Sequence, residues 1–153
     1  MTSVALTSAL KSLVRPAVGL VREIPVHTEL VRNKGNGPMA VFLPCEGRVG
    51  AALLRIYAIA EALRKLGWRT LVVPPRLTLA QRQRLLVRAG PNILVMQGAR
   101  HHLNRPEFYP DIPIVYDMDD ADFHLPHLAR AVRNAMAQVE MVTAGSGLSL
   151  IHI

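Results

Sequence analysis

Residues 112–124 read IPIVYDMDDADFH, an apolar run followed directly by a cluster of carboxylates. The apolar, partly β-branched residues that precede Asp117 suit a buried parallel strand. All aspartates of the chain lie between Asp111 and Asp122, where this strand is expected to leave the sheet. Ligands of open α/β sheets bind at the carboxyl ends of strands, so we expect this segment to line a ligand cleft.

Outward from this stretch, strand and helix patterns alternate. Strands are predicted over 39–43, 68–73, 92–97 and 113–116, with a fifth beginning at 141, and helices over 51–66, 78–88 and 125–139. Thr78 is expected to cap the second helix, whose polar side carries Gln81, Arg82, Gln83 and Arg84. Such alternation predicts an α/β fold with a Rossmann-like parallel sheet and helices on both faces, built from right-handed βαβ units.

Residues 1–38 are interpreted as an amino-terminal extension and linker. Apolar residues at helical spacing predict a helix that Pro16 interrupts, and it carries Lys11, Arg15 and Arg22. One interpretation is a basic helix on the inner face of a membrane, and the other is an extension that packs on its own domain or is disordered. Few charges and an interior proline favour the second. Without a long apolar run or a secretory signal, we expect a cytoplasmic location.

Composition restricts the partners. A net charge of +7 and a pI near 10.5 indicate attraction to phosphates. Aromatic residues are only 5% of the chain and are not interleaved with basic runs, so nucleic acid is not expected as a partner. The single cysteine, Cys45, excludes an intramolecular disulfide, and it is expected to be a buried thiol within the first strand.

The loop between the first strand and the first helix contains Gly47, Arg48 and Gly50. Backbone N–H groups at such a position can hold a phosphate or another anion, although the same glycines are equally suited to a tight turn. The dinucleotide fingerprint and the Walker loop are both missing, which argues against an NAD dehydrogenase and an NTPase. No cofactor is expected.

The acidic segment has two interpretations that stay open. Its aspartates can face a ligand, or they can cap the helix that follows. His124 near these carboxylates is a candidate general base, because its reference pKa lies near neutrality. His101 with His102, and His124 with His127, could be considered metal pairs, but each lacks a third ligand, so no metal site is expected.

Several segments together resemble the amino-terminal half of a glycosyltransferase of the GT-B fold, similar to glycosyltransferase family 4. They are Leu43-Pro44 through Gly50, Leu54-Arg55-Ile56-Tyr57, Ala62-Leu63 to Leu66-Gly67-Trp68, and Val115-Tyr116-Asp117-Met118-Asp119-Asp120. The resemblance covers about residues 39–146 and implies a Rossmann-like acceptor domain. It implies catalytic roles for Asp117, Asp119, Asp120 and His124, and substrate-binding roles for Gly47, Arg48, Gly50 and Arg55.

The resemblance also implies partners outside this chain. A nucleotide-sugar donor would bind a second α/β half, whose Glu-x7-Glu motif has no counterpart here, and a carbohydrate or lipid-linked acceptor would bind this half. Residues 147–153 resemble translated adapter sequence, so we expect a native chain that continues past Ser146 and a fragment that is inactive alone. The alternatives are a non-catalytic α/β binding module and a phosphohydrolase similar to haloacid dehalogenases, whose nucleophile signature is also Asp-x-Asp at a strand end.

Overall fold

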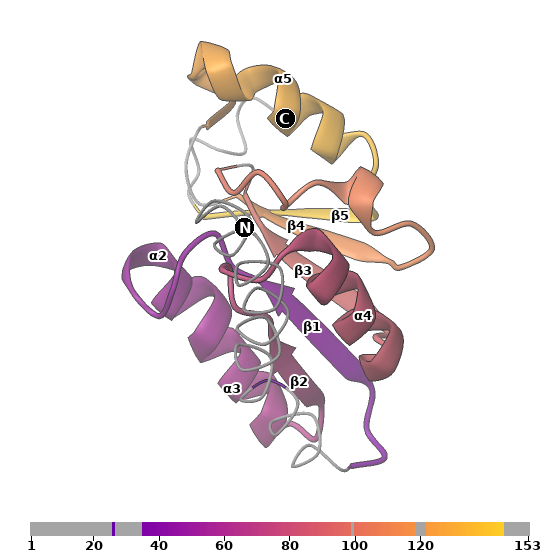
Figure 1. Cartoon of the computed structure of the whole chain (residues 1–153). Coiled ribbons are helices and arrows are strands. Elements are labelled where there is room, and N and C mark those ends of the chain that lie inside the picture. Colours follow the sequence, from indigo (N-terminus) through magenta and orange to yellow (C-terminus); the bar gives the residue numbers. More distant parts are fainter. Residues whose placement is uncertain (1–25, 27–34, 99, 119–121, 146–153) are drawn as a thin grey trace, which may run out of the picture.

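Five parallel strands form one sheet in this computed structural model, which describes residues 26, 35–98, 100–118 and 122–145 (Figure 1). The strands are β1 (Met39–Leu43), β2 (Arg69–Val72), β3 (Ile93–Gln97), β4 (Ile114–Met118) and β5 (Met141–Ala144). Their order is β2-β1-β3-β4-β5, and each neighbouring pair is parallel. The predicted α/β fold with a Rossmann-like parallel sheet is therefore confirmed.

The helical segments connect these strands. They are α2 (Gly50–Ala52), the π-helical segment η1 (Leu53–Tyr57), α3 (Ala58–Lys65), α4 (Leu79–Ala89), the 3-10 turns η2 (Pro106–Phe108) and η3 (Asp122–His124), and α5 (Pro126–Met136). The first three follow one another without a break between β1 and β2. Thr78 caps the start of α4, as predicted. The structure adds a capping box with Gln81, and Gly90 ends the helix in a left-handed conformation.

The two faces of the sheet pack against different helices. Side chains alternate along β1, so Met39, Val41 and Leu43 join a large buried cluster with residues of α4 and α5. Ala40 and Phe42 point the other way and pack against Ile56 and Ala60 of η1 and α3. Helices cover both faces, as the alternation predicted, but the core on the α4 and α5 side is much the larger.

Within residues 1–34, Val26 is the position that the structure describes. It is 3% exposed and belongs to the larger hydrophobic cluster. At this position the chain packs on the domain. The predicted helix that Pro16 interrupts and the carboxyl-terminal tail lie outside the described residues. Within the described part of the chain, every helix is too short or too polar to cross a bilayer.

Candidate functional site

The carboxyl ends of β1 and β3 meet at the centre of the sheet. In a doubly wound sheet of order 2-1-3-4-5, the crossovers from these two strands run to opposite faces, and ligands bind in the crevice between them. The loop that follows β1 and Gly98, which follows β3, lie at this point. The all-parallel order places the carboxyl ends of β1 and β4 at the same edge of the sheet.

Asn104 holds the ends of β1 and β3 together. Its side-chain amide donates to the carbonyl oxygens of Leu43 at 3.0 Å and Gln97 at 2.8 Å, and the residue is 1% exposed. The backbone N–H of Cys45 donates to Oε1 of Gln97 at 3.0 Å, which adds a second link. The prediction of a buried thiol within the strand is wrong, because β1 ends at Leu43 and Cys45 is half-buried in the loop beyond it.

Arg82 of α4 contacts the Asn104 side chain that joins the two strand ends. It was predicted on the polar side of the helix, but its side chain is 0% exposed. The guanidinium donates to the carbonyl oxygens of Pro75 at 2.8 Å and Leu77 at 3.3 Å, and to Oδ1 of Asn104 at 3.0 Å. Arg82 therefore orients the amide that joins the two strand ends. The sequence carried no signal of this role, since its partners come from two separate loops.

His101 packs beside Arg82 in its neutral form. The N–H of Leu103 donates to Nδ1 at 3.1 Å, so the ring proton resides on Nε2, 3.1 Å from the carbonyl oxygen of Pro75. Burial, followed by the positive charges of Arg82 and His102, lowers the pKa of His101 to about 4. A neutral imidazole held on both nitrogens acts as part of the scaffold. Among the described residues, no group of three side chains is arranged to hold a metal ion.

Arg55 and Asp117 meet at the same edge although they are 62 residues apart in sequence. Nε of Arg55 donates to Oδ2 of Asp117 at 2.8 Å, a second bond joins Nη2 to Oδ1, and the hydroxyl of Thr143 donates to Oδ1 at 2.7 Å. Asp117 is 4% exposed. A carboxylate with three donors is suited to fixing Arg55 rather than to accepting a proton from a substrate.

The π-helical segment η1 carries Arg55 to this position. Such segments are rare within helices and are frequently found at functional sites. Sequence reasoning singled out both Arg55 and Asp117, and the structure brings them together. Sequence reasoning did not predict the pairing, because the π-helical turn between β1 and β2 leaves no recognisable pattern in the sequence.

Asp122 forms the second arginine pair of the acidic segment. Nε and Nη2 of Arg100 donate to Oδ1 of Asp122 at 3.1 and 2.8 Å, and Asp122 is 2% exposed. Gly98 lies close by in a left-handed conformation, with φ of 40°. Asp117 and Asp122, the described aspartates of the acidic segment, are thus both neutralised by arginines. Asp119 and Asp120 lie outside the described residues.

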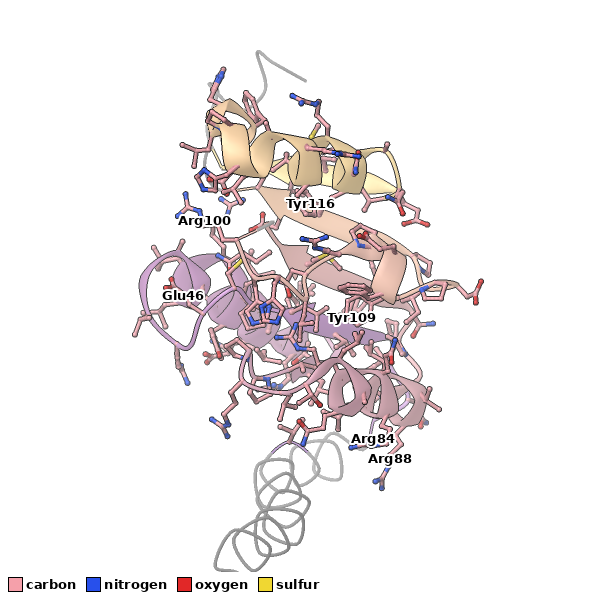
Figure 2. The ribbon with its side chains drawn as sticks, turned by 45° about the horizontal axis from the view of Figure 1, so that its top comes forward. Glu46, Arg84, Arg88, Arg100, Tyr109 and Tyr116 are labelled. Carbon is pink, nitrogen blue, oxygen red and sulfur yellow. The ribbon has the colours of Figure 1, made fainter. Side chains whose placement is uncertain are left out.

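The glycine loop adopts the tight turn that one interpretation predicted. The N–H of Val49 donates to the carbonyl oxygen of Gly47 at 2.7 Å, and Gly50 has φ of 52°, which favours glycine. A carboxylate oxygen of Glu46 lies 2.6 Å from the place where a Cβ of residue 50 would stand. Figure 2 shows Glu46 and Arg100 at one side of the domain, away from Arg88 on α4.

His124 is exposed at the end of η3. Its ring centroid lies 4.4 Å from that of Phe123, at a tilted angle. It follows β4 on the carboxyl side, so it shares the edge with Asp117 by topology. Exposure keeps this imidazole accessible to a ligand, as a general base requires.

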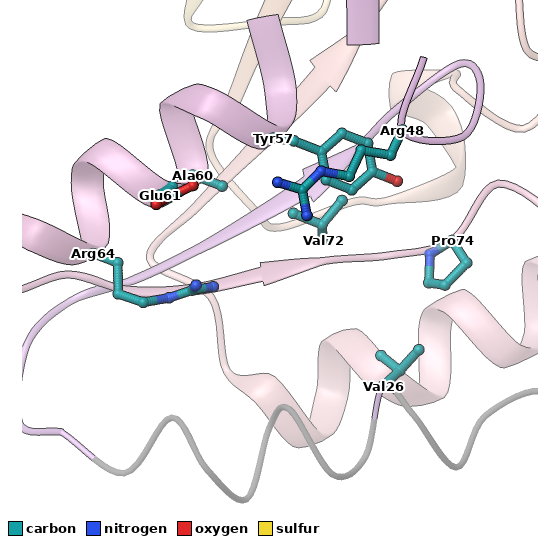
Figure 3. Close-up of a pocket in the computed structure, with 8 residues that line it drawn as sticks. All are labelled: Val26, Arg48, Tyr57, Ala60, Glu61, Arg64, Val72 and Pro74. Atoms are coloured by element: carbon teal, nitrogen blue, oxygen red, sulfur yellow. The ribbon is translucent and has the colours of Figure 1, made fainter. Parts of the chain in front are cut away.

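Arg48 lines a pocket of about 280 Å³ beside β2 (Figure 3). Its guanidinium carbon lies 5.7 Å from the centroid of the Tyr57 ring. The other lining residues are Val26, Ala60, Glu61, Arg64, Val72 and Pro74.

Comparison with known proteins adds no assignment to this geometry, since no protein-family model and no curated protein matches the chain.

Proposed function

We propose that this domain is the acceptor-binding half of a sugar transferase. The enzyme would move a sugar from a nucleotide-sugar donor, bound by a second α/β half, to a hydroxyl group of a carbohydrate or lipid-linked acceptor. The observation that supports this most strongly is the Arg55–Asp117 pair, because it joins the helix after β1 to the end of β4 at the edge where α/β sheets bind ligands. A cytoplasmic location, with peripheral contact at the inner face of the membrane, belongs to the same proposal.

The residues would divide the work as follows. Asp117 positions Arg55, whose side chain is 25% exposed and faces the acceptor. An attacking hydroxyl must lose its proton to a base within hydrogen-bond reach, and Asp119, Asp120 or His124 supplies that base. Gly47 and Gly50 let the backbone of the first loop approach the transferred group.

Binding and transfer experiments test this assignment. Nucleotide sugars of uridine and guanosine should give no saturable heat with this chain at micromolar concentration, whereas acceptor sugars should shift the amide signals of Gly98 and Asp117. Arg55→Gln should remove those shifts and Arg88→Gln, on the exposed side of α4, should not. Micromolar binding of a nucleotide sugar would mean that this domain is the donor half of the enzyme and not the acceptor half.

In a chain extended by the second half, Asp119→Asn and Asp120→Asn should each reduce sugar transfer while the melting temperature stays nearly unchanged. If both replacements destabilise the fold, and the molecules that still fold keep full activity, these carboxylates only cap the next helix. A folded, extended protein without any transferase activity would favour the non-catalytic binding module instead.

The phosphohydrolase alternative is less compatible with the geometry. It requires Asp117 as a nucleophile beside Mg²⁺, but this carboxylate is buried and accepts three hydrogen bonds. We expect millimolar Mg²⁺ to leave the melting temperature unchanged and p-nitrophenyl phosphate to remain intact. A clear Mg²⁺-dependent rise in melting temperature would return this alternative to consideration.

A further inference from the structure

The pocket beside β2 is lined by both charged and apolar side chains. β2 is an edge strand of the described sheet, and its Val72, with Pro74 just beyond it, contributes to the apolar floor. Ala60 and Val26 complete this floor, while charged side chains from α3 and the first loop form the rim (Figure 3). Ligand pockets combine apolar surface with placed polar groups, and in this pocket the polar share is the larger.

The rim of this pocket is positively charged. Arg48 comes from the loop after β1 and Arg64 from α3, and Figure 3 shows both guanidinium groups directed into the space between α3 and β2. Glu61 is the acidic residue of the lining, and its carboxylate lies 3.8 Å from Nζ of Lys65 on the solvent side of the helix. A ligand that enters therefore meets two cations and is favoured if it is an anion.

Arg48 is held in place before any ligand arrives. Its guanidinium stacks over the Tyr57 ring, a contact that attracts the cation to the aromatic face. A preorganised arginine loses less side-chain freedom on binding. Two planar forks from different elements suit a tetrahedral phosphate, which has enough terminal oxygens for both, whereas a carboxylate is satisfied by one fork.

We propose that this pocket binds a small phosphomonoester, with Arg48 and Arg64 on the phosphate and the organic part against Ala60, Val72 and Pro74. The volume of about 280 Å³ admits a phosphate with a short or flat organic group. The site is separate from the Arg55–Asp117 pair and does not rest on the sugar-transfer proposal. The phosphomonoester can be a free metabolite or the headgroup of a lipid.

Calorimetric titration of the whole chain with phenyl phosphate, inorganic phosphate and benzoate tests the site. Phenyl phosphate should bind saturably and more tightly than inorganic phosphate, because only it uses the apolar floor. Arg48→Gln and Arg64→Gln should each weaken binding by about ten-fold or more, as expected when a charge-assisted contact is lost. Arg88→Gln removes the same charge from an exposed part of α4 and should leave binding nearly unchanged.

The urea midpoints of the variants verify that each one folds. Absence of saturation at millimolar phenyl phosphate, equal loss in the Arg88 control, or equal binding of benzoate would overturn the assignment. Vesicles that contain phosphatidic acid, which has a phosphomonoester headgroup, distinguish the two sources. If the protein binds these vesicles and Arg48→Gln abolishes the binding, the ligand is a lipid. If the protein binds phenyl phosphate but not the vesicles, the ligand is soluble. Arg55→Gln should not affect any of these titrations, which keeps this test independent of the transferase test.

Discussion

Two arginines reach inward in this domain, and the protein compensates their charges differently. Arg82 is 0% exposed, and its partners include the carbonyl oxygens of Pro75 and Leu77 and the amide oxygen of Asn104. Arg55 is paired with the carboxylate of Asp117 and keeps 25% of its side chain exposed. The first arrangement uses neutral acceptors to fix the scaffold, and the second leaves a charged group at the edge where a ligand can meet it.

Removing the buried arginine should have the largest effect on stability. Arg82→Met would leave the acceptors at Pro75, Leu77 and Asn104 without their donor, and each unsatisfied buried group costs about 1–3 kcal/mol. We expect a total loss of about 3–4 kcal/mol in urea unfolding. Arg88→Met, on an exposed part of the same helix, should change stability by less than about 0.5 kcal/mol. A similar small change in both variants would contradict the scaffold role.

Breaking the edge pair should cost less. Asp117→Asn leaves the Arg55 charge without its counterion, and we expect a loss of about 2–3 kcal/mol, below the range for fully buried pairs because Arg55 is 25% exposed. The double variant with Arg55→Gln should recover part of this loss. A double-mutant cycle measures the coupling, and a value near zero would show that the two groups stabilise the fold independently.

Acid should weaken the Arg82 region through His101. The pKa of His101 is lowered to about 4 in the folded protein, whereas the unfolded chain binds a proton near pH 6.5. Its contribution is thus complete above pH 6.5 and is lost as the pH falls toward 4. Because this side chain is only partly buried, we expect about 1–2 kcal/mol. The stability of His101→Gln, measured across this window, should depend less on pH, and an unchanged slope would exclude the histidine as the cause.

The smallest expected effect concerns the start of the helix that carries Arg82. Thr78→Ala removes the hydroxyl that accepts from the N–H of Gln81 at 3.3 Å, which should cost about 1 kcal/mol in urea unfolding. Thr78→Ser keeps the cap and should be nearly neutral. A loss as large as that of Arg82→Met would indicate that helix fraying, rather than the guanidinium, governs this region.

The sequence predicted the elements well because their signals are local. The first strand was expected at 39–43 and lies at Met39–Leu43, and Thr78 caps its helix as predicted. Gly67 ends the first long helix with φ of 88°, a conformation that glycine favours. Apolar periodicity and cap residues depend on neighbours within a few positions, so a single sequence contains them in full.

The wrong predictions involve contacts between distant segments. Arg82 was placed on a polar helix face, but Asn104, 22 residues further along the chain, provides a buried acceptor for it. The first long helix was predicted over 51–66, but this segment divides into α2, η1 and α3, and Leu54 is 70% exposed while Ile56 is 0% exposed. Both residues belong to the π-helical segment η1, whose wider turn changes the phase of the helix. Such features depend on tertiary structure and cannot be obtained from periodicity.

The strand order also has a consequence for biosynthesis. Among the described strands β1 is translated first, and its two neighbours, β2 and β3, both follow it in the chain. The strand Met39–Leu43 is fully buried in the complete domain. In a nascent chain that ends before residue 93, the edge of this strand that later pairs with β3 is open to other chains. Parallel pairs form only after long crossovers close, which makes such sheets slow to fold. Synthesis of this domain should consequently depend on chaperones more than its final stability would suggest, at least until β3 has left the ribosome.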